Sequence, residues 1–180
     1  LTSLDVGRNK IGDEGAKAIG AALAVNISLR SLNLGYNKIG EEGAKAIGAA
    51  LAVNSSLTTL YLAGNTIGNE GTKAIGAALA VNSSLTSLDL RENGIGTAGG
   101  KAIAEALAVN GSLTSLKLRG NYTIGSEGGS AIAEALKVNS SLKKLVLPDG
   151  LEKHEGLVAV CKAKGIGLGM GLGFVLEPYI

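Results

Sequence analysis

Leucines recur along the chain in a short alternating pattern that returns every 28 residues. A sixth unit starts one residue late, so that the units begin at Leu1, Leu29, Leu57, Leu85, Leu113 and Leu142. In the third unit Leu60 and Leu62 alternate with smaller or more polar residues, which predicts a short strand with one apolar face. A fixed period of this size indicates stacked supersecondary units, each of which contacts only its neighbours.

The second half of each unit has the spacing of a helix. Apolar residues of the first unit fall at intervals of three and four, which predicts an inward stripe of Gly15, Ala18, Ile19, Ala22 and Leu23. Position 13 is expected to be the helix N-cap, because four of its five occupants are good capping residues: Asp13, Glu41, Asn69, Thr97 and Ser126. Helices are expected to run to about Val81 and its equivalents, and then to end at residues that tolerate a left-handed turn: Asn26, Asn54, Asn82, Asn110 and Asn139.

A second set of asparagines follows the predicted strands. These are Asn9, Asn37, Asn65, Asn93 and Asn121. A carboxamide both donates and accepts hydrogen bonds, so a buried column of them satisfies loop backbone that no sheet pairs. This structural role is sufficient to explain the asparagine column, and no ligand site is assigned to it.

Strand and helix always follow in the same order, which predicts a parallel sheet inside a curved solenoid with helices outside. The pattern LxxLxLxxNxIGxEGxxAIxxALxVNxS resembles the leucine-rich repeat family, in particular its ribonuclease-inhibitor-like branch, which is also found in NOD-like receptors. The resemblance implies an α/β solenoid with strands on the concave face and helices on the convex face. It covers residues 1 to about 147 and is specific for fold rather than for function.

Two regions are expected. Residues 1–147 hold five units of 28–29 residues plus a sixth strand, and residues 148–180 hold a C-terminal cap helix and a glycine-rich apolar tail. The cap helix is expected over 151–164, stopped by Gly165. Glycine alternates with apolar residues from Ile166 to Phe174, which favours a cap strand or a tail that docks on a partner. Leu1 opens partway into a unit, so the chain is expected to belong to a longer array or to have its first edge covered.

Composition and charge narrow the function classes. A net charge of +2, with only four Tyr and one Phe, argues against nucleic acid as partner. A single cysteine, with no leader and no long apolar run, fits a reducing, cytoplasmic location, and membrane contact is expected only through neighbouring subunits. The helix-ending asparagines lie in Asn-x-Ser sequons, and Asn121 begins a further one, but their structural role explains the period without glycans.

No catalytic constellation is found in the sequence. His154 and Cys161 lie seven residues apart, which is two helical turns and too far for a nucleophile pair. The glycines around Lys101 fail the spacing of a phosphate loop, because Ile95 stands where its first glycine is needed. No metal-ligand spacing occurs. The sequence therefore predicts no enzyme activity and no cofactor.

Units differ most at the outward strand positions, while their cores are nearly identical. Tyrosine, arginine and mixed charges on a rigid sheet suit protein recognition. The predicted protein-binding residues are Asp5, Asn33, Tyr36, Tyr61, Asp89, Arg91, Lys117 and Arg119. The outer helix face is expected to be smooth, since Gly20, Ala21 and Ala24 recur in the next two units.

Together these features predict a non-catalytic scaffold that binds a protein partner through its concave strand face. One alternative is a structural subunit of a multi-subunit complex, held by the smooth convex helices and the C-terminal tail. Another is a GTPase-activating repeat protein, because one such group resembles this branch and acts through loop residues that include an arginine. That group's motif maps onto none of Arg8, Arg91 and Arg119, so no residue is carried over.

Overall fold

Strands and helices alternate along the whole described chain. The computed structural model describes residues 1–148 and 150–169. Its strands are β1 (Ser3–Asp5), β2 (Ser31–Asn33), β3 (Thr59–Tyr61), β4 (Ser87–Asp89), β5 (Ser115–Lys117), β6 (Lys144–Val146) and β7 (Gly167–Gly169). Its helices are α1 (Gly12–Val25), α2 (Glu41–Val53), α3 (Gly68–Leu79), α4 (Thr97–Val109), the short 3₁₀ helix η1 (Tyr122–Ile124), α5 (Gly125–Val138) and α6 (Glu155–Ala163).

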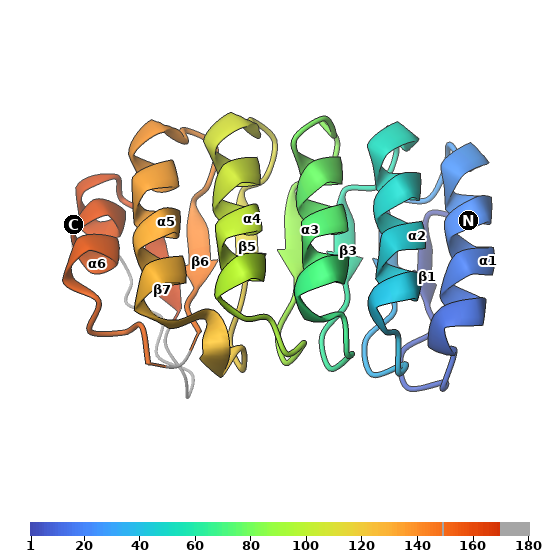
Figure 1. Ribbon diagram of the computed structural model, residues 1–180. Helices are drawn as coiled ribbons and strands as arrows, with labels where there is room; N and C mark the ends of the chain where they lie inside the picture. Colours follow the sequence, from blue (N-terminus) through green and yellow to red (C-terminus); the bar gives the residue numbers. More distant parts are fainter. Residues whose placement is uncertain (149, 170–180) are drawn as a thin grey trace.

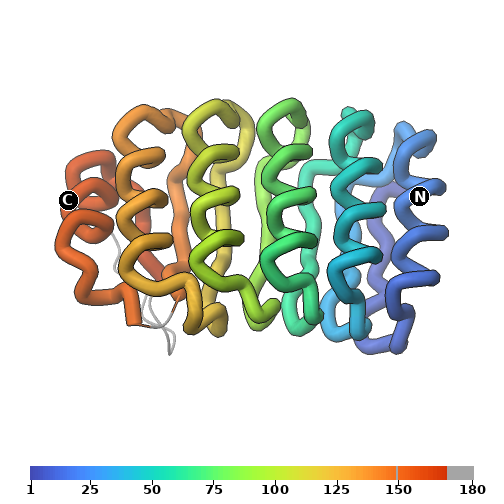
Figure 2. The backbone as a smooth tube through the Cα atoms, in the orientation of Figure 1, coloured from blue at the N-terminus to red at the C-terminus, as the bar shows by residue number. Residues whose placement is uncertain are grey.

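The strands form one parallel sheet in sequence order, β1 to β7, which confirms the predicted solenoid. The helices stand side by side in a layer that covers one face of this sheet (Figure 1). The N-terminus and α6 lie at opposite ends of the stack (Figure 2). Leucines of successive strands are in register, from Leu4 with Leu32 through to Leu145 with Leu168. This register lines up equivalent side chains of every unit in straight rows across the sheet.

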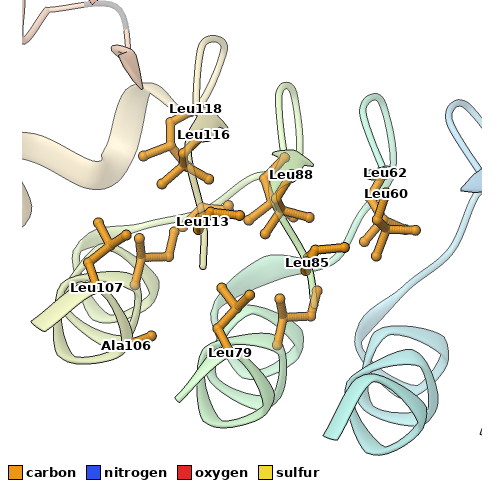
Figure 3. Packing of buried hydrophobic residues seen from close by; sticks show 14 of the residues in the cluster. Leu60, Leu62, Leu79, Leu85, Leu88, Ala106, Leu107, Leu113, Leu116 and Leu118 are labelled. Atoms are coloured by element: carbon orange, nitrogen blue, oxygen red, sulfur yellow. The ribbon is translucent and has the colours of Figure 1, made fainter. Parts of the chain in front are cut away.

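The core lies between the sheet and the helix layer. Leu60, Leu88 and Leu116 point from the strands toward leucines at the ends of the helices, such as Leu79 and Leu107 (Figure 3). All five are 2% exposed or less, and complete burial of a leucine side chain contributes about 1.5–3 kcal/mol. Among the described residues no helix has the length and apolar character to cross a membrane.

The buried stripe of the helices is wider than the sequence predicts. In α2 it comprises Gly43, Ala44, Ile47, Gly48, Ala50 and Leu51. In α1 the predicted Ala18 and Ala22 are exposed, whereas Ala16 and Gly20 are buried. The stripe is wider because a helix inside the stack contacts both the sheet and the neighbouring helices.

Glycines at one helix position hold the first helices close together. A Cβ atom added to Gly20 would lie 2.9 Å from the carbonyl oxygen of Ala46, and one on Gly48 would lie 2.9 Å from that of Ala74. The prediction that these glycines belong to a smooth outer surface is therefore wrong, because they are buried between helices. Ala21 and Ala49, in contrast, are exposed as expected.

The helix starts are capped differently from the prediction. Position 13 lies inside or at the first residue of each helix, and no side chain caps α1 to α5 from the N-cap position. Instead the Asp13 carboxylate accepts hydrogen bonds from the Gly40 and Gly43 amides at the start of the next helix, at 2.7 and 2.9 Å. Asn69 accepts in the same way from Gly96 and Gly99, at 2.9 Å each. Capping thus links one unit to the next.

The helix ends are also capped by the next unit. Asn26, Asn54, Asn110 and Asn139 have extended backbone, with φ from −80° to −67°, so the predicted left-handed turn is wrong. The Asn54 amide donates to the carbonyls of Leu23 and Asn26 at 2.8 Å each. Its Oδ1 accepts from the amides of Ser56 and Leu57. Asn54 is buried and makes these four hydrogen bonds inside the fold. In the folded chain the sequon asparagines therefore have a structural role.

The C-terminal part completes the stack. Helix α6 is shorter than the predicted 151–164, since His154 is its N-cap and its Nδ1 accepts from the Leu157 amide. Gly165 follows the helix with a φ of +64°, as expected for a stop. Strand β7 pairs with β6, which agrees with the predicted cap strand over its first residues. The remainder of the predicted tail lies outside the described residues.

Candidate functional site

A hollow of about 350 Å³ opens on the concave strand face. It is lined by Asp5, Gly7, Arg8, Asn33, Gly35, Tyr36, Tyr61, Ala63, Asp89 and Arg91. Six of the eight predicted binding residues are in this set. Lys117 and Arg119 lie outside the hollow, one strand further along the sheet.

Register brings the predicted residues together. Asp5 pairs with Asn33, Asn33 with Tyr61, Tyr61 with Asp89 and Asp89 with Lys117 across neighbouring strands. Parallel strands lie about 4.8 Å apart, so these outward side chains form one continuous row. The row was predictable from the sequence, because strand residues at the same position of each repeat must lie on the same face of the sheet.

The first part of the row shapes its own backbone. Asp5 Oδ1 accepts from the Gly7 amide and Asn33 Oδ1 accepts from the Gly35 amide, both at 2.9 Å. Such short turns hold the loop after each strand close to the row. A tyrosine ring cannot make this bond, so Tyr61 leaves the third unit without it.

The Asp89 carboxylate is the most buried charge of the hollow, with 2% of its side chain exposed. Arg91 donates to it from Nε at 2.9 and 3.0 Å and from Nη2 at 2.6 Å, and Lys117 Nζ lies 3.8 Å away. The hydrogen bond to Asp89 raises the pKa of Arg91 above its ordinary value. A buried carboxylate needs such pairing. This network is therefore a fixed wall of the hollow.

A second row, in the loops, borders the hollow. Its backbone has positive φ in the first five units, at Arg8, Tyr36, Gly64, Glu92 and Gly120. The Tyr36 ring lies over Gly64, where an added Cβ would come within 2.3 Å of ring carbons. Arg8 Cζ lies 4.7 Å from the centre of the same ring, and the Tyr36 hydroxyl donates to Glu92 at 3.3 Å. Tyr36 thus contacts residues of three other units, through its ring face and through its hydroxyl.

Arg8 and Glu92 are site residues that the predicted set omits. The signal was present in the sequence, because both occupy the same loop position as Tyr36. What the sequence could not supply is the reach of the tyrosine side chain across Gly64, because this depends on the missing Cβ of that glycine.

Two groups of the hollow keep free bonding capacity. Within the described part of the chain, the Asp5 carboxylate has no cation within ion-pair distance and accepts one amide hydrogen bond. The Tyr61 hydroxyl has no hydrogen-bond partner among those residues, and its side chain is half-buried between neighbouring strands. A carboxylate and a phenol on a rigid sheet are suited to binding donor groups of a partner.

A smaller hollow of about 310 Å³ lies near the start of α5. Its lining residues are Tyr122, Gly125, Ser126, Gly150, Leu151, Lys153 and His154. Because His154 Nδ1 accepts from an amide, its Nε2 carries the proton, and this atom lies 3.1 Å from Ser130 Oγ. His154 therefore uses Nδ1 to cap α6 and Nε2 to contact α5, which holds the two helices together. None of the predicted binding residues lines this smaller hollow.

The remaining candidate for nucleophilic chemistry is Cys161. Its side chain is buried, and burial raises the pKa of its thiol from 9.0 to about 11. A thiol with a raised pKa is a poor nucleophile at neutral pH. In residues 1–148 and 150–169 no group of three or more His, Cys, Asp and Glu side chains could hold a metal ion.

Several solved structures are similar to this chain. A structure titled Leiomodin-1 Actin-Binding Site 2 has a TM-score of 0.73 at 24% identity, covering 83% of this chain and 85% of that one. The tropomodulin C-terminal domain of Caenorhabditis elegans has a TM-score of 0.63 at 17% identity, covering 77% and 84%. The leucine-rich repeat protein LegL7 of Legionella pneumophila has a TM-score of 0.55 at 21% identity, covering 99% and 68%. These likenesses show the fold.

The sequence comparisons are more limited. No match was found among curated proteins. The family described as Leucine Rich repeat matches residues 1–20, 25–48, 53–76, 81–104 and 109–133, which is most of the chain. Each matched segment holds one strand and the first part of the helix that follows it, so the matches recur with the strand–helix units of the solenoid. The chain therefore belongs to the leucine-rich repeat family.

Proposed function

We propose that this chain is a non-catalytic scaffold that binds a protein partner through the concave hollow. The observation that carries the proposal is the convergence of Asp5, Tyr36 and Tyr61 in one hollow. Among residues 1–148 and 150–169, the Asp5 carboxylate has no ion-pair partner and the Tyr61 hydroxyl has no hydrogen-bond partner. Leucine-rich repeat proteins are protein-interaction scaffolds. Tyrosine and arginine are the residue types that most often anchor interfaces.

The surroundings of the cysteine, histidine and arginine side chains support a binding role rather than a catalytic one. Cys161 is buried as a neutral thiol, and His154 is held by the start of α6 and by Ser130. Arg91 is clamped to Asp89, which leaves it poorly placed to insert into a GTPase active site. The free cysteine also fits our proposal that the scaffold works in a reducing, intracellular compartment.

Actin is one candidate partner to test. Leiomodin-1 is described by its title as an actin-binding site, and the identity of 24% relates it to this chain by fold alone. Actin is therefore one arm of the test. Cosedimentation with actin filaments measures it directly, alongside partners identified by cross-linking and mass spectrometry in the source cell.

The test compares variants inside and outside the hollow. Tyr61→Ala combined with Asp5→Ala removes the two side chains with free bonding capacity and leaves the Asp89 network intact. We expect it to weaken partner binding by about 2–4 kcal/mol, as for interface anchors. Lys144→Ala on β6 is the matched control, because it changes an exposed residue of the same sheet beyond the hollow.

Equal affinity of the double variant and the wild-type chain, with circular dichroism unchanged, would remove the concave hollow as the binding site. Stimulation of GTP hydrolysis in a panel of small GTPases, lost in Arg8→Ala, would replace the scaffold by the GTPase-activating alternative.

A further inference from the structure

The column of loop asparagines is interrupted between the third and the fourth unit. At three other boundaries, the side-chain oxygen of a loop asparagine accepts hydrogen bonds from two loop amides of the preceding unit. These oxygens and their donors, at 2.8–3.4 Å, are Asn37 with Asn9 and Ile11, Asn65 with Asn37 and Ile39, and Asn121 with Asn93 and Ile95. In residues 1–148 and 150–169, the buried Asn93 Oδ1 accepts no hydrogen bond, and its expected donors, the amides of Asn65 and Ile67, have no acceptor.

The interruption originates at Thr66, which lies between these two amides. The equivalent residues Lys10, Lys38 and Gly94 have φ from +56° to +66°, whereas Thr66 has a negative φ. A β-branched residue strongly disfavours positive φ. Instead the amide and the hydroxyl of Thr66 both donate to the Ile39 carbonyl, at 2.8 and 3.2 Å. The threonine therefore binds this loop to the second unit, and the two amides miss their acceptor in the fourth.

The unpaired groups make the closed form of this loop less stable than the equivalent loops. Asn65, Ile67 and Asn93 are at most 6% exposed. A buried polar group without a partner is costly, and water can bind all three groups once the loop moves away from the fourth unit. Local opening is therefore easier at this boundary than at the three intact ones.

The opening is confined to a short segment. The amides of Gly64 and Gly68, on either side of it, donate to the carbonyls of Arg91 and Asn93 at 2.9 and 3.0 Å. These two bonds hold the ends of the loop against the fourth unit. The segment that can separate is therefore residues 65–67, which we call the gate loop.

The Tyr36 side chain holds the gate loop from outside. Its ring lies over Gly64, where an added Cβ would come within 2.3 Å of ring carbons. Its hydroxyl donates to Glu92 Oε2 in the fourth unit at 3.3 Å. The side chain thus starts in the second unit, passes over the third and ends on the fourth. It crosses the boundary at which the asparagine column is interrupted.

From the unpaired buried groups, the conformation of Thr66 and the position of Tyr36 together, we propose that the gate loop opens locally against the fourth unit and that Tyr36 is its latch. The loop adjoins Ala63 and Tyr36, which line the concave hollow, so its opening changes the rim of the hollow. The open form offers two backbone donors and the Asn93 oxygen at this rim. The inference does not depend on whether a partner occupies the hollow.

Hydrogen exchange of single amides, followed by NMR on the free chain, tests the opening. We expect the Asn65 and Ile67 amides to exchange at least about tenfold faster than those of Asn37 and Ile39, which hold the same repeat positions and are equally buried. The Gly68 amide, which keeps its bond to the fourth unit, is the internal control and should stay slow.

A reciprocal exchange of residues tests the cause. Thr66→Lys installs the residue that the first two units have at this place, and it should slow the Asn65 and Ile67 amides by about tenfold. Lys38→Thr should move the interruption to the second unit and accelerate the Asn37 and Ile39 amides by a similar factor. Both substituted side chains are exposed, so neither change threatens the fold.

Tyr36→Phe tests the latch, because it keeps the ring over Gly64 and removes only the hydrogen bond to Glu92. We expect the Asn65 and Ile67 amides to exchange about threefold faster than in the wild-type chain. Tyr122→Phe, at an exposed tyrosine of the fifth unit, is the matched control and should change neither amide.

Equal exchange of the gate-loop amides and their equivalents in the wild-type chain would overturn the inference, since an ordered water that fills the gap gives that result. Thr66→Lys without slower exchange, at unchanged circular dichroism, would overturn it too. Unchanged exchange in Tyr36→Phe would exclude Tyr36 as the latch.

Discussion

Asparagine is used in two opposite ways in two regions of this molecule. At the helix C-terminal edge, Asn54 and Asn82 are buried. Each makes two donor and two acceptor bonds to backbone groups of the preceding unit, its own unit and the first residue of the next unit. On the concave face, Asn33 makes one bond to the loop beside it and is half-buried. The edge position is asparagine in the first five units, whereas the strand position changes from unit to unit. Repetition therefore marks side chains that are committed to the scaffold, and variation marks those available to a partner.

The largest expected effect comes from breaking the repeated edge. Asn82→Ala removes the hydrogen bonds that the Asn82 side chain makes to the Leu51 carbonyl and to the amides of Ser84 and Leu85, and it leaves the Asn54 carbonyl with the Ser84 hydroxyl at 3.4 Å. Each lost partner of a buried polar group costs about 1–3 kcal/mol, so we expect a loss of about 3–5 kcal/mol in the free energy of unfolding. Chemical denaturation measures it.

The control for this change is Ser83→Ala, which alters the exposed neighbouring residue and should be nearly neutral. A loss below about 1 kcal/mol for Asn82→Ala would mean that water replaces the hydrogen bonds of the amide. The asparagines of this edge would then not be essential for the stability of the scaffold.

The next effect concerns the close helix contact. Gly48→Ala places a Cβ 2.9 Å from the Ala74 carbonyl oxygen, which is closer than a real side chain sits. Alanine is favoured over glycine in helices by about 1 kcal/mol, yet we expect a net loss of about 1–3 kcal/mol from overpacking. Gly111→Ala, where an added Cβ meets nothing within 4 Å, is the matched control. Stabilisation by Gly48→Ala would contradict the tight packing of α2 on α3.

A finer comparison lies inside the loop asparagine column. Asn121 accepts from the amides of Asn93 and Ile95 and donates to two carbonyls. Asn93 donates likewise, but its buried Oδ1 has no hydrogen-bond partner in the part of the chain that the structure describes. Asn121→Ala should therefore cost about 1–2 kcal/mol more than Asn93→Ala in the free energy of unfolding. Equal costs in thermal or urea unfolding would indicate an ordered water at Asn93.

The smallest effect on stability is expected on the concave face. Tyr61→Ala removes a half-buried side chain whose hydroxyl makes no hydrogen bond to any described residue. We expect the free energy of unfolding to change by less than about 1 kcal/mol, while partner binding falls. A loss of stability as large as that of Asn82→Ala would place Tyr61 with the scaffold.

Much of the fold was predictable from residue spacing. The period located the strands, the register of the leucines and the row from Asp5 to Lys117, because strand side chains must alternate between two faces. Capping was predicted wrongly. Asp13 and Asn54 are typical capping residues, but the sequence does not reveal that their backbone targets belong to a neighbouring unit.

The site was predicted in part for the same reason. Tyr36 was found by its type and its place in the loop, while its partners Arg8 and Glu92 depend on how far side chains reach across units. Asp89 and Asp5 also differ in their partners. Arg91 binds the Asp89 carboxylate, whereas no described cation lies within ion-pair distance of Asp5, and this difference depends on side-chain geometry rather than on residue type.

Capping between units sets where this chain can be cut and rejoined. The sequence repeat of the third unit spans residues 57–84. However, the carbonyls of Leu79, at the end of α3, and of Asn82, after it, accept hydrogen bonds from the side-chain amide of Asn110 in the next unit. A cassette moved into another repeat array would need residues 57–110 or an asparagine supplied by the recipient at the matching place. The physically complete module of this protein is thus longer than the period of its sequence, and engineering by whole periods should fail at every junction that lacks this residue.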